Sequence, residues 1–401
     1  MAEESRQSTE VSALLRALLD KGNAYNTGDT VSPKELYQAA KELANALQPP
    51  FERIAQLSMY EPTIATAVRV CIQLKLFDKM AEVKLPKTVD ELAQMTGADP
   101  KLLRRMLQHL ATAQLVDEAG PDNYGPNSVT NTLAEEKAQG MFKDCFDGLS
   151  IENANVIPYF RTQLGGFINP TDKDKTLFKF SHKTDQHYFD WIFQPGNEER
   201  KTAFLNHMKL KTLGPRWFQE VPVAEMLAPA CGPDDVLLVD IGGATGHDLE
   251  AFHTAFPDMP GRLILQDLPG AIAELDALAL APMEAMAYDF FKPQPVKGAR
   301  AYYLKMVLHD WPDAQCRAIL ESLKPALVRG QSKILINEIV VPSMGAGWFE
   351  TSVDMLMMMF HAAYERRENE WRELIEGAGL KVSKIWQCGE AVERLIVVEL
   401  P

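Results

Sequence analysis

The sequence has little positive charge relative to its negative charge. Lysine and arginine together number 41 and aspartate and glutamate 55, which gives a formal net charge of -14 at pH 7. Proteins that bind nucleic acid through its phosphates need a basic surface. The charge balance therefore argues against a nucleic-acid partner, and it is compatible with a cationic ligand.

Cysteine is also scarce. The chain has five cysteines in 401 residues, and none of them forms a C-x-x-C pair. An odd number of scattered cysteines predicts neither a disulfide framework nor a structural zinc site. Reduced thiols in a cytoplasmic protein are the expected state.

Long apolar runs are missing as well. No stretch approaches the roughly 18 consecutive apolar residues of a membrane span, and the first ten residues, MAEESRQSTE, are polar and acidic. A signal peptide needs a basic start and an apolar core, which this segment does not provide. We expect a soluble, cytoplasmic protein without a membrane partner.

The sequence does contain enough apolar residues, 46%, for the cores of two domains. Residues 1–50 carry helical patches, and residues 51–125 predict several helices followed by a hairpin over LVDEAGPDNYGPN. Thr88 or Asp90 is expected to begin one helix and Asp99 the next. This order is typical of a winged helix, but residues 82–125 hold seven acidic and five basic residues. We therefore expect packing or dimerisation rather than DNA binding.

From Val236 onward, short apolar segments alternate with helical ones. Such alternation predicts βαβ units and a mostly parallel sheet. The last two strands are joined near Gly389 by a short connection, so they should form an antiparallel hairpin. The expected fold class is α/β, in three parts: a mainly α, winged-helix-like dimerisation domain (1–125), a helical connecting and pocket segment (126–230), and a domain with a mostly parallel seven-stranded sheet (231–401).

The first strand, VLLVD, runs into a glycine-rich turn and then into a helix. Gly242, Gly243 and Gly246 let the backbone turn tightly and approach a ligand, and the amides of the helix start point at that ligand. Asp240 places a carboxylate where a cationic amino group could lie. The spacing D-x-G-x-x-x-G differs from the dinucleotide pattern G-x-G-x-x-G.

Two further acids follow the next two strands. Asp267 ends the second strand, where an acid meets ribose hydroxyls in doubly wound folds. Asp289 follows the third strand, and Phe290 beside it could cover a flat base. Three acids after three consecutive strands predict one ligand site at the carboxyl edge of the sheet.

The fourth strand, within YYLKMVL, ends in His309 and Asp310. Asp310, Pro312 and Asp313 are expected to start the next helix, because proline and acidic residues favour a helix N-terminus. A helix start does not account for His309, so we expect its role to depend on what lies near it in space.

These motifs, together with NEIVVP and ERRENEW further on, resemble the S-adenosylmethionine (SAM)-dependent O-methyltransferases of the plant caffeate/flavonoid type, and most closely their fungal secondary-metabolite relatives. The resemblance covers about residues 50–401. It implies a Rossmann-like, SAM-binding catalytic domain, and an N-terminal domain that dimerises and closes the substrate pocket. In one departure, Ala244 stands where the family usually has a third successive glycine.

The resemblance also implies a role for each matching residue. His309 falls at the family's catalytic base, and Glu338 and Glu365 fall at the acids that flank it. The implied cofactor site comprises Asp240, Gly242, Gly243, Gly246, Asp267, Leu268, Asp289, Phe290 and Lys305. The implied substrate contacts are Met208, Trp217, Asp354, Met358 and His361, of which His361 is equally consistent with a structural hydrogen-bonding role. No spacing of His, Cys or carboxylates suggests a metal site.

Physical reasoning agrees with these roles. Ligands of a doubly wound sheet bind beyond the strand ends where the first and fourth strands are neighbours. His309 leaves the fourth strand and Glu338 the fifth, so the two should meet there. A phenol, with a pKa of about 10, is a poor nucleophile near neutral pH, and a histidine can take its proton. Either Glu338 or Glu365 could bind the other ring nitrogen and fix the tautomer.

We therefore predict a SAM-dependent O-methyltransferase that acts on a phenolic or enolic hydroxyl of a secondary metabolite. The alternative is a SAM-binding enzyme of the same fold that catalyses dehydration or pericyclic rearrangement of a polyketide-derived substrate, with a basic side chain hydrogen-bonded to a carbonyl. A catalytically silent, SAM-binding partner is a third reading. His309 with its acids favours methyl transfer, whereas Ala244 and the unusual HAAYERRE segment favour the others. The expected partners are a small aromatic or polyketide-derived substrate and a second copy of the chain, bound through the N-terminal domain.

Overall fold

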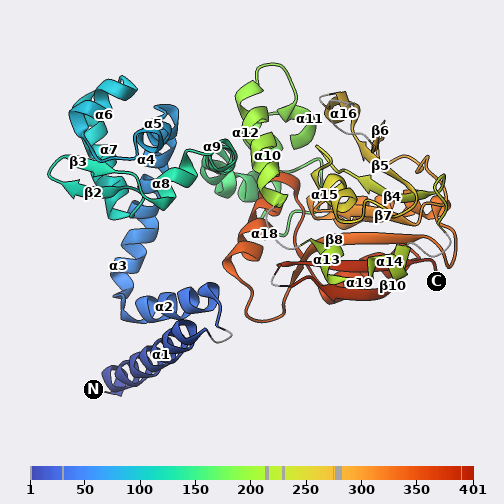
Figure 1. Cartoon of the computed structure of the whole chain (residues 1–401), viewed down its shortest axis with the longest axis horizontal. Helices are drawn as coiled ribbons and strands as arrows, with labels where there is room; N and C mark the ends of the chain where they lie inside the picture. The colour runs from blue at the N-terminus through green and yellow to red at the C-terminus, as the bar shows by residue number, and fades with distance from the viewer. Residues whose placement is uncertain are drawn as a thin grey trace. The chain divides into compact units, whose positions relative to one another are not determined.

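The computed structural model describes residues 2–28, 31–212, 216–227, 231–273, 275, 282–389 and 391–401. The chain forms two compact units, Met1–Ala134 and Glu135–Pro401, which run from blue to teal and from green to red in Figure 1. The finer division at residues 125 and 230 remains a prediction, and residue 230 lies outside the described residues.

The N-terminal unit is mainly helical. Its small antiparallel sheet has the order β1-β3-β2, formed by Lys87–Thr88, Asn123–Gly125 and Asp117–Gly120. A π-helical turn, Gln56–Tyr60, joins α3 to α4. The helices are α1 (Ala2–Thr27), α2 (Pro33–Leu47), α3 (Pro50–Ala55), α4 (Glu61–Gln73), α5 (Leu76–Val83), α6 (Val89–Thr96), α7 (Pro100–Thr112) and α8 (Ser128–Leu133).

Local side-chain contacts explain where two of these helices begin. The Thr88 hydroxyl accepts the Glu91 N–H at 3.3 Å, and the Glu91 carboxylate accepts the Thr88 N–H at 2.8 Å. This reciprocal capping box makes Thr88, rather than Asp90, the cap of α6. Asp99 caps α7 by accepting the Leu102 N–H at 2.9 Å, as expected. The predicted hairpin is the antiparallel pair β2–β3.

The second unit begins with a helical segment whose two longest helices pack very closely. A Cβ atom added at Gly140 of α9 would lie 2.5 Å from the Asn206 Cβ of α12, and one added at Gly148 would lie 2.7 Å from the Phe360 ring of α18. Only glycine fits at such contacts. The helices are α9 (Glu136–Pro158), α10 (Leu177–His182), α11 (Tyr188–Ile192), α12 (Glu198–Met208), α13 (Trp217–Glu220), α14 (Val223–Leu227) and, later in the chain, α18 (Trp348–His361).

The central sheet has the strand order β10-β11-β8-β7-β4-β5-β6, and the two-residue strand β9 (Arg366–Arg367) pairs with the end of β8. Its strands are β4 (Val236–Ile241), β5 (Arg262–Asp267), β6 (Glu284–Ala287), β7 (Ala301–Lys305), β8 (Lys333–Val341), β10 (Lys381–Gln387) and β11 (Glu393–Glu399). Within the described sheet, β11 alone runs opposite to the other strands, because it is antiparallel to both β8 and β10. The mostly parallel seven-stranded sheet and its terminal hairpin are thus confirmed. β4 pairs with β7, so the first and fourth strands are neighbours, as expected.

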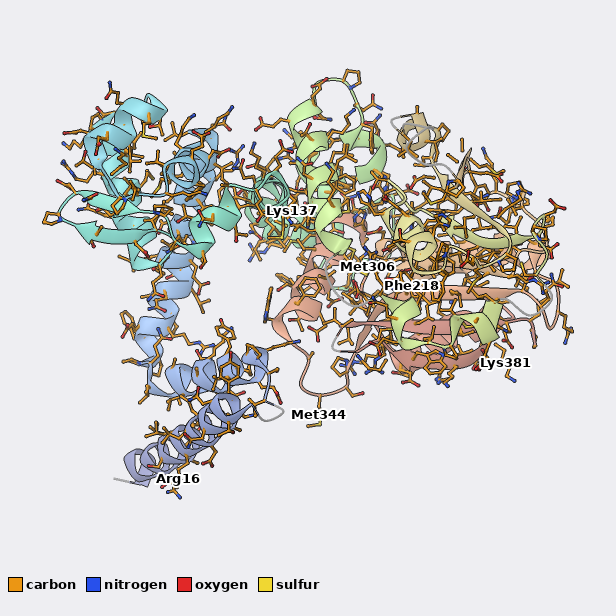
Figure 2. All side chains as sticks on the ribbon, viewed as in Figure 1. Arg16, Lys137, Phe218, Met306, Met344 and Lys381 are labelled. Atoms are coloured by element: carbon orange, nitrogen blue, oxygen red, sulfur yellow. The ribbon has the colours of Figure 1, made fainter. Side chains whose placement is uncertain are left out.

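Helices cover both faces of this sheet. Tyr302 and Tyr303 are consecutive in β7 and so point to opposite faces. Tyr302 packs in one core with Trp371 of α19 (Glu368–Gly377), and Tyr303 packs in the other with Phe252 of α15 (His247–Ala255). Phe218 of α13, labelled in Figure 2, belongs to the second core and is 5% exposed. Among the described residues, every helix is too short or too polar to cross a membrane.

Candidate active site

The glycine-rich turn between β4 and α15 requires its glycines. Gly242 and Gly246 have φ angles of 74° and 78°, in the left-handed region that favours glycine. A Cβ added at Gly243 would lie 2.5 Å from both Asp240 Oδ2 and Leu265 Cδ1. Ala244 also has a positive φ, 49°, and its N–H donates to Asp267 Oδ2 at 2.8 Å. That hydrogen bond holds the alanine in a conformation that glycine would adopt with less strain.

Asp240 lies under this turn with an unsatisfied oxygen. Asp240 is 2% exposed. Its Oδ2 atom has no hydrogen-bond partner among the described residues. Burial raises the pKa of Asp240 to about 7, against the effect of Lys305. A buried carboxylate oxygen without a donor can be stabilised by a cationic group.

Asp267 ends β5 on the other side of the turn. Its Oδ1 atom accepts the Leu268 N–H at 2.7 Å, and its Oδ2 atom accepts the Ala244 N–H. Burial raises the pKa of Asp267, and these two backbone hydrogen bonds oppose that rise. Each carboxylate oxygen keeps a second lone pair, so the fixed carboxylate can accept further hydrogen bonds from hydroxyls.

The next two strands supply the remaining residues of the predicted cofactor site. Asp289 Oδ1 accepts the Phe291 N–H at 3.0 Å, and the Phe290 ring meets the Trp311 ring edge-on, with centroids 5.9 Å apart. At the end of β7, Lys305 Nζ lies 2.8 Å from Asp248 Oδ2. Asp248 in the first turn of α15 was not predicted from the sequence, although an acid is favoured there; it also pairs with Arg216.

His309 lies in a short 3₁₀ turn, Leu308–Asp310, that follows β7. The residue is 0% exposed, and its Nδ1 atom lies 2.6 Å from Glu365 Oε1. A carboxylate accepts only, so Nδ1 carries the proton. The Nε2 atom has no hydrogen-bond partner among the described residues. Of the two candidate acids, Glu365 is the one that contacts the imidazole.

Glu338 holds the backbone of the same turn instead. Its Oε1 atom accepts the N–H groups of Val307 and Leu308 at 2.9 and 2.7 Å. The expectation that Glu338 leaves the fifth strand was wrong, because it lies inside β8. Lys305, the last residue of β7, is in register with Asn337. β8 is therefore longer than its neighbour, and Glu338 lies beside the turn that follows β7.

Asp310 was predicted to start the next helix, and this was wrong. Helix α17 (Asp313–Leu323) begins three residues later, with Pro312 as its cap. Asp310 Oδ1 instead lies 3.5 Å from His309 Nε2 and 3.7 Å from His361 Nε2. Asp310 is thus a third carboxyl group around the imidazole, in addition to Glu338 and Glu365.

The charges of this cluster act on one another. Burial disfavours the imidazolium form, but Asp310, Glu365 and Glu338 outweigh it and raise the pKa of His309 to about 9. Burial also raises the pKa of Glu338 to about 7, with His309 acting in the opposite direction. Potential metal-ligand atoms of His309, Glu338 and Glu365 lie within 4.8 Å of one another. Oε1 of each glutamate already accepts hydrogen bonds, and the expected lack of a metal site stays a prediction.

The predicted substrate residues are placed in different surroundings. Asp354 of α18 accepts the Glu365 N–H at 2.8 Å, and His361 ends the same helix beside Asp310. Met208 and Met358 are half-buried. Trp217 is 2% exposed and packs against Phe252 and Tyr303 in a core of the sheet, which is typical of a structural side chain.

A histidine that no sequence motif predicted for the site lies close by. His187 stacks on Trp311, with ring centroids 4.6 Å apart and planes 9° apart, and its ring centroid is 5.2 Å from that of His361. Burial lowers the pKa of His187 to about 4, so its imidazole is neutral. His187, Trp311 and Phe291 line a cavity of about 320 Å³.

Comparisons with known proteins identify the family of the chain. Residues 235–381 match an O-methyltransferase domain and residues 62–136 an O-methyltransferase dimerisation domain. The chain is 36% identical to methyltransferase cfoC of Aspergillus candidus over 97% of this chain and 98% of that protein. It is 34% identical to demethylsterigmatocystin 6-O-methyltransferase of Aspergillus parasiticus, over 94% of this chain and 95% of that one.

The chain belongs to the O-methyltransferase family. Solved structures agree with this membership. LepI in complex with SAM has a TM-score of 0.86 at 28% identity and covers 98% of this chain and 100% of its own. A structure described as a pericyclic reaction enzyme has a TM-score of 0.85 at 28% identity, with the same coverage. The fold class, the enzyme family and SAM as its cofactor therefore agree with the sequence predictions.

The residues of this O-methyltransferase fit SAM. The unsatisfied Oδ2 atom of Asp240 lies where a cationic amino group would satisfy it. The glycine-rich turn has no room for side chains at Gly242 and Gly243, where a Cβ atom would lie 2.9 Å or less from its neighbours. Asp267 retains capacity for ribose hydroxyls, and Phe290 offers an apolar surface for the base.

Proposed function

We propose that this protein transfers the methyl group of SAM to a phenolic or enolic hydroxyl of a secondary metabolite, with His309 as the general base. The observation that carries this proposal is the buried His309–Glu365 contact of 2.6 Å. It holds the proton on Nδ1 and leaves Nε2, which makes no hydrogen bond with the described residues, to accept another.

The chain's own part in the reaction follows from this arrangement. Nε2 of His309 accepts the proton of the substrate hydroxyl, and the electron pair of the broken O–H bond stays on the oxygen, which becomes the nucleophile. The imidazolium that forms lies 2.6 Å from Glu365 Oε1 and 3.5 Å from Asp310 Oδ1. Both carboxyl groups stabilise it.

Asp240, the glycine-rich turn, Asp267 with Leu268, Asp289, Phe290 and Lys305 would hold SAM at the carboxyl edge of the sheet. SAM, when bound, supplies a methyl group on a positively charged sulfur. The contribution of these residues is orientation, since holding two reactants in line removes much of the entropic barrier.

The substrate class is inferred from two methionine side chains and from the relatives. Met208 and Met358 are half-buried and can adapt to a flat aromatic surface. The name of the Aspergillus parasiticus relative gives a demethylsterigmatocystin as its substrate, and a small aromatic or polyketide-derived molecule suits this chain as well.

A homodimer through the N-terminal unit and a cytoplasmic location complete the proposal. Light scattering on the purified protein tests the dimer.

The test of function is a screen of phenolic and enolic metabolites scored by release of S-adenosylhomocysteine (SAH). We expect at least one to be methylated, and we expect His309→Ala to reduce kcat by roughly 10²- to 10⁴-fold. A His253→Ala control should keep full activity, because His253 lies in the last turn of α15 and is assigned no role at the site. Full activity of His309→Ala would contradict the assignment of the base.

One observation favours a second candidate function. With its pKa raised to about 9, His309 is mainly protonated at neutral pH in the absence of ligand, and an imidazolium can donate a hydrogen bond to a carbonyl. That chemistry suits a dehydration or rearrangement, and one solved structure with this fold is described as a pericyclic reaction enzyme. The two functions predict opposite pH dependence: methyl transfer needs neutral His309 and rises with pH, whereas carbonyl activation needs the imidazolium and falls.

A further inference from the structure

Arg366 is fully buried, and the proposed reaction gives it no role. It follows Glu365 directly in the chain and lies in β9, in register with Val340 of β8. A guanidinium removed from water must be paired and hydrogen-bonded, because a buried charge without partners is strongly destabilising. The partners of Arg366 therefore show which part of the fold its charge stabilises.

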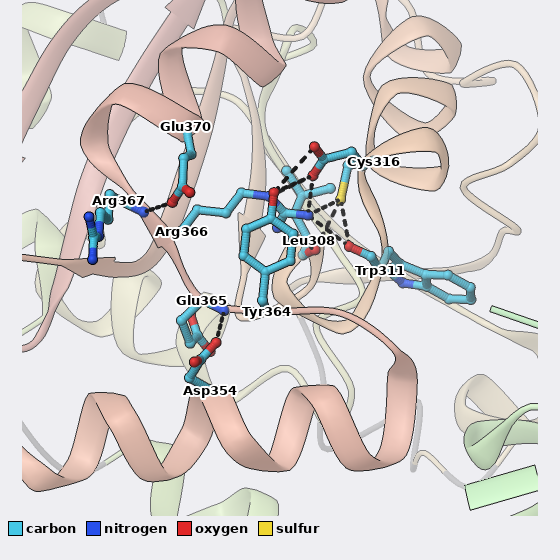
Figure 3. A network of polar contacts seen from close by, with 10 residues as sticks. Leu308, Trp311, Cys316, Asp354, Tyr364, Glu365, Arg366, Arg367 and Glu370 are labelled. Carbon is cyan, nitrogen blue, oxygen red and sulfur yellow. Dashed lines mark hydrogen bonds and ion pairs between the residues drawn. The ribbon is translucent and has the colours of Figure 1, made fainter. Parts of the chain in front are cut away.

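Those partners belong to the segment that carries His309 (Figure 3). Nη1 of Arg366 donates to the Leu308 carbonyl at 3.3 Å, and Nη2 donates to the Trp311 carbonyl at 2.9 Å. Leu308 precedes His309, and Trp311 follows two residues after it. Nε and Nη2 also bind Asp313 Oδ1 at 3.0 and 2.8 Å. One planar side chain thus contacts the backbone on both sides of the histidine.

Two aromatic rings restrict the guanidinium further. Its central carbon lies 4.6 Å from the Tyr364 ring centroid and 5.1 Å from that of Trp371. The Tyr364 hydroxyl donates to the same Asp313 carboxylate at 3.1 Å. Arginine suits this environment because its donors form a rigid planar fork that stacks on aromatic rings, whereas a lysine offers a single compact ammonium.

The turn around His309 is therefore held by opposite charges. Glu338 accepts the N–H groups of Val307 and Leu308, and Arg366 donates to the carbonyls of Leu308 and Trp311. Glu365, the neighbour of Arg366, binds the imidazole itself. Two consecutive residues thus act on this turn: Arg366 binds its backbone, and Glu365 binds the imidazole of His309.

We propose that Arg366 is a positioning residue, which fixes the backbone around His309 so that Nδ1 meets Glu365 and Nε2 faces the substrate. Its kinetic consequence rests on the proposed function, but its structural consequence does not. Arg366 touches neither substrate nor cofactor in this account, so it acts on the reaction only through His309.

The kinetic test replaces Arg366 by lysine, which keeps the charge and loses the fork. Since small displacements of a reacting group can reduce the rate about 100-fold, we expect Arg366→Lys to lower kcat by roughly 10- to 100-fold. The Kd for SAM should stay within about twofold. Arg367→Lys, at the exposed next position, should keep full activity. In a His309→Ala background, Arg366→Lys should cause no further loss, because the group that it positions is absent. An equal loss in both backgrounds would overturn the proposal.

A substrate-free test separates this proposal from the proposed function. The downfield proton resonance of His309 Nδ1–H, assigned with ¹⁵N-histidine labelling and the His309→Gln variant, reports the contact with Glu365 directly. We expect it to shift upfield or disappear in Arg366→Lys and to persist in Arg367→Lys. If Arg366→Lys does not fold, Asp313→Ala removes one hydrogen-bond partner of the guanidinium and should produce a smaller shift in the same direction. An unchanged resonance in the folded variant would refute the positioning role, even if methyl transfer is established.

Discussion

The Nδ1 atom of His309 and the Oε1 atom of Glu365 lie 2.6 Å apart, although 56 positions separate the two residues in the chain. Both side chains are completely buried. Because Nδ1 is bonded to Glu365, Nε2 is the ring nitrogen that can bind a ligand.

Replacement of Glu365 tests this contact. Glu365→Gln keeps an oxygen that can accept the Nδ1 proton but removes the charge that stabilises the imidazolium. A hydrogen bond to a charged group contributes about 1.5–3 kcal/mol, so we expect kcat to fall by roughly 10- to 100-fold. Glu368→Gln, on the exposed first turn of α19, is the matched control and should retain wild-type turnover. Equal kcat values for the two variants would show that Glu365 does not support the base.

Glu338 should matter for stability as well as activity. Glu338→Ala leaves the buried N–H groups of Val307 and Leu308 without an acceptor, and each unsatisfied group costs about 1–3 kcal/mol. We therefore expect a loss of roughly 2–5 kcal/mol in the free energy of unfolding, measured by urea denaturation. Glu338→Gln, which keeps one carbonyl oxygen for both donors, should lose less than half as much. The two variants would be equally stable if the backbone hydrogen bonds contributed nothing.

The pH dependence of turnover follows from the surroundings of His309. Its carboxyl neighbours raise its pKa to about 9, and the base must be neutral to accept a proton. Protonation of His309 therefore inhibits methyl transfer. The kcat/KM of this reaction should rise about tenfold per pH unit from pH 7 and level off near pH 9. His309→Gln should be much slower and should lose the plateau near pH 9, because its rate follows only the ionisation of a substrate with a pKa of about 10. A rate that stays level from pH 7 to 8 and falls as the pH passes 9 would instead support carbonyl activation by the imidazolium.

Asp240 should control the affinity for SAM. Its Oδ2 atom is buried without a partner among the described residues, and burial raises its pKa to about 7. Since the ionised carboxylate is the form that attracts a cation, the Kd for SAM should fall as the pH rises from 6 to 8. Asp240→Asn should weaken binding by roughly 10-fold or more and abolish this pH dependence, measured by calorimetry. Asp234→Asn, an exposed neighbour, should bind as the wild type does; wild-type affinity of Asp240→Asn would remove Asp240 from the cofactor site.

Much of this site was predictable from the sequence because several of its residues occupy strand ends. Asp267 and His309 each lie at or just after the end of a short apolar segment, and parallel strands bring their carboxyl ends to one edge. The pairing of β4 with β7 was predicted from the strand order of doubly wound sheets. The cap at Thr88 followed from the three-residue spacing to Glu91.

Other features depend on tertiary structure that no local pattern encodes. Glu338 was expected where the fifth strand ends, and only the register of β8 with the shorter β7 shows that it lies inside the strand and beside the turn after β7. Asp310 has the composition of a helix start, yet it lies beside two histidines because α17 begins at Asp313. Arg366 reads as one more charge in a charged segment, and only its burial shows that it binds the turn around His309.

Methyl transfer itself is tested by the ratio of SAH to product for the cognate substrate. Wild-type protein is incubated with SAM labelled in its methyl group, and SAH, labelled product and consumed substrate are quantified together by mass spectrometry. We predict one SAH and one labelled methyl group for each substrate molecule consumed, with both lost in His309→Ala. Substrate conversion without SAH or label in the product would contradict the account.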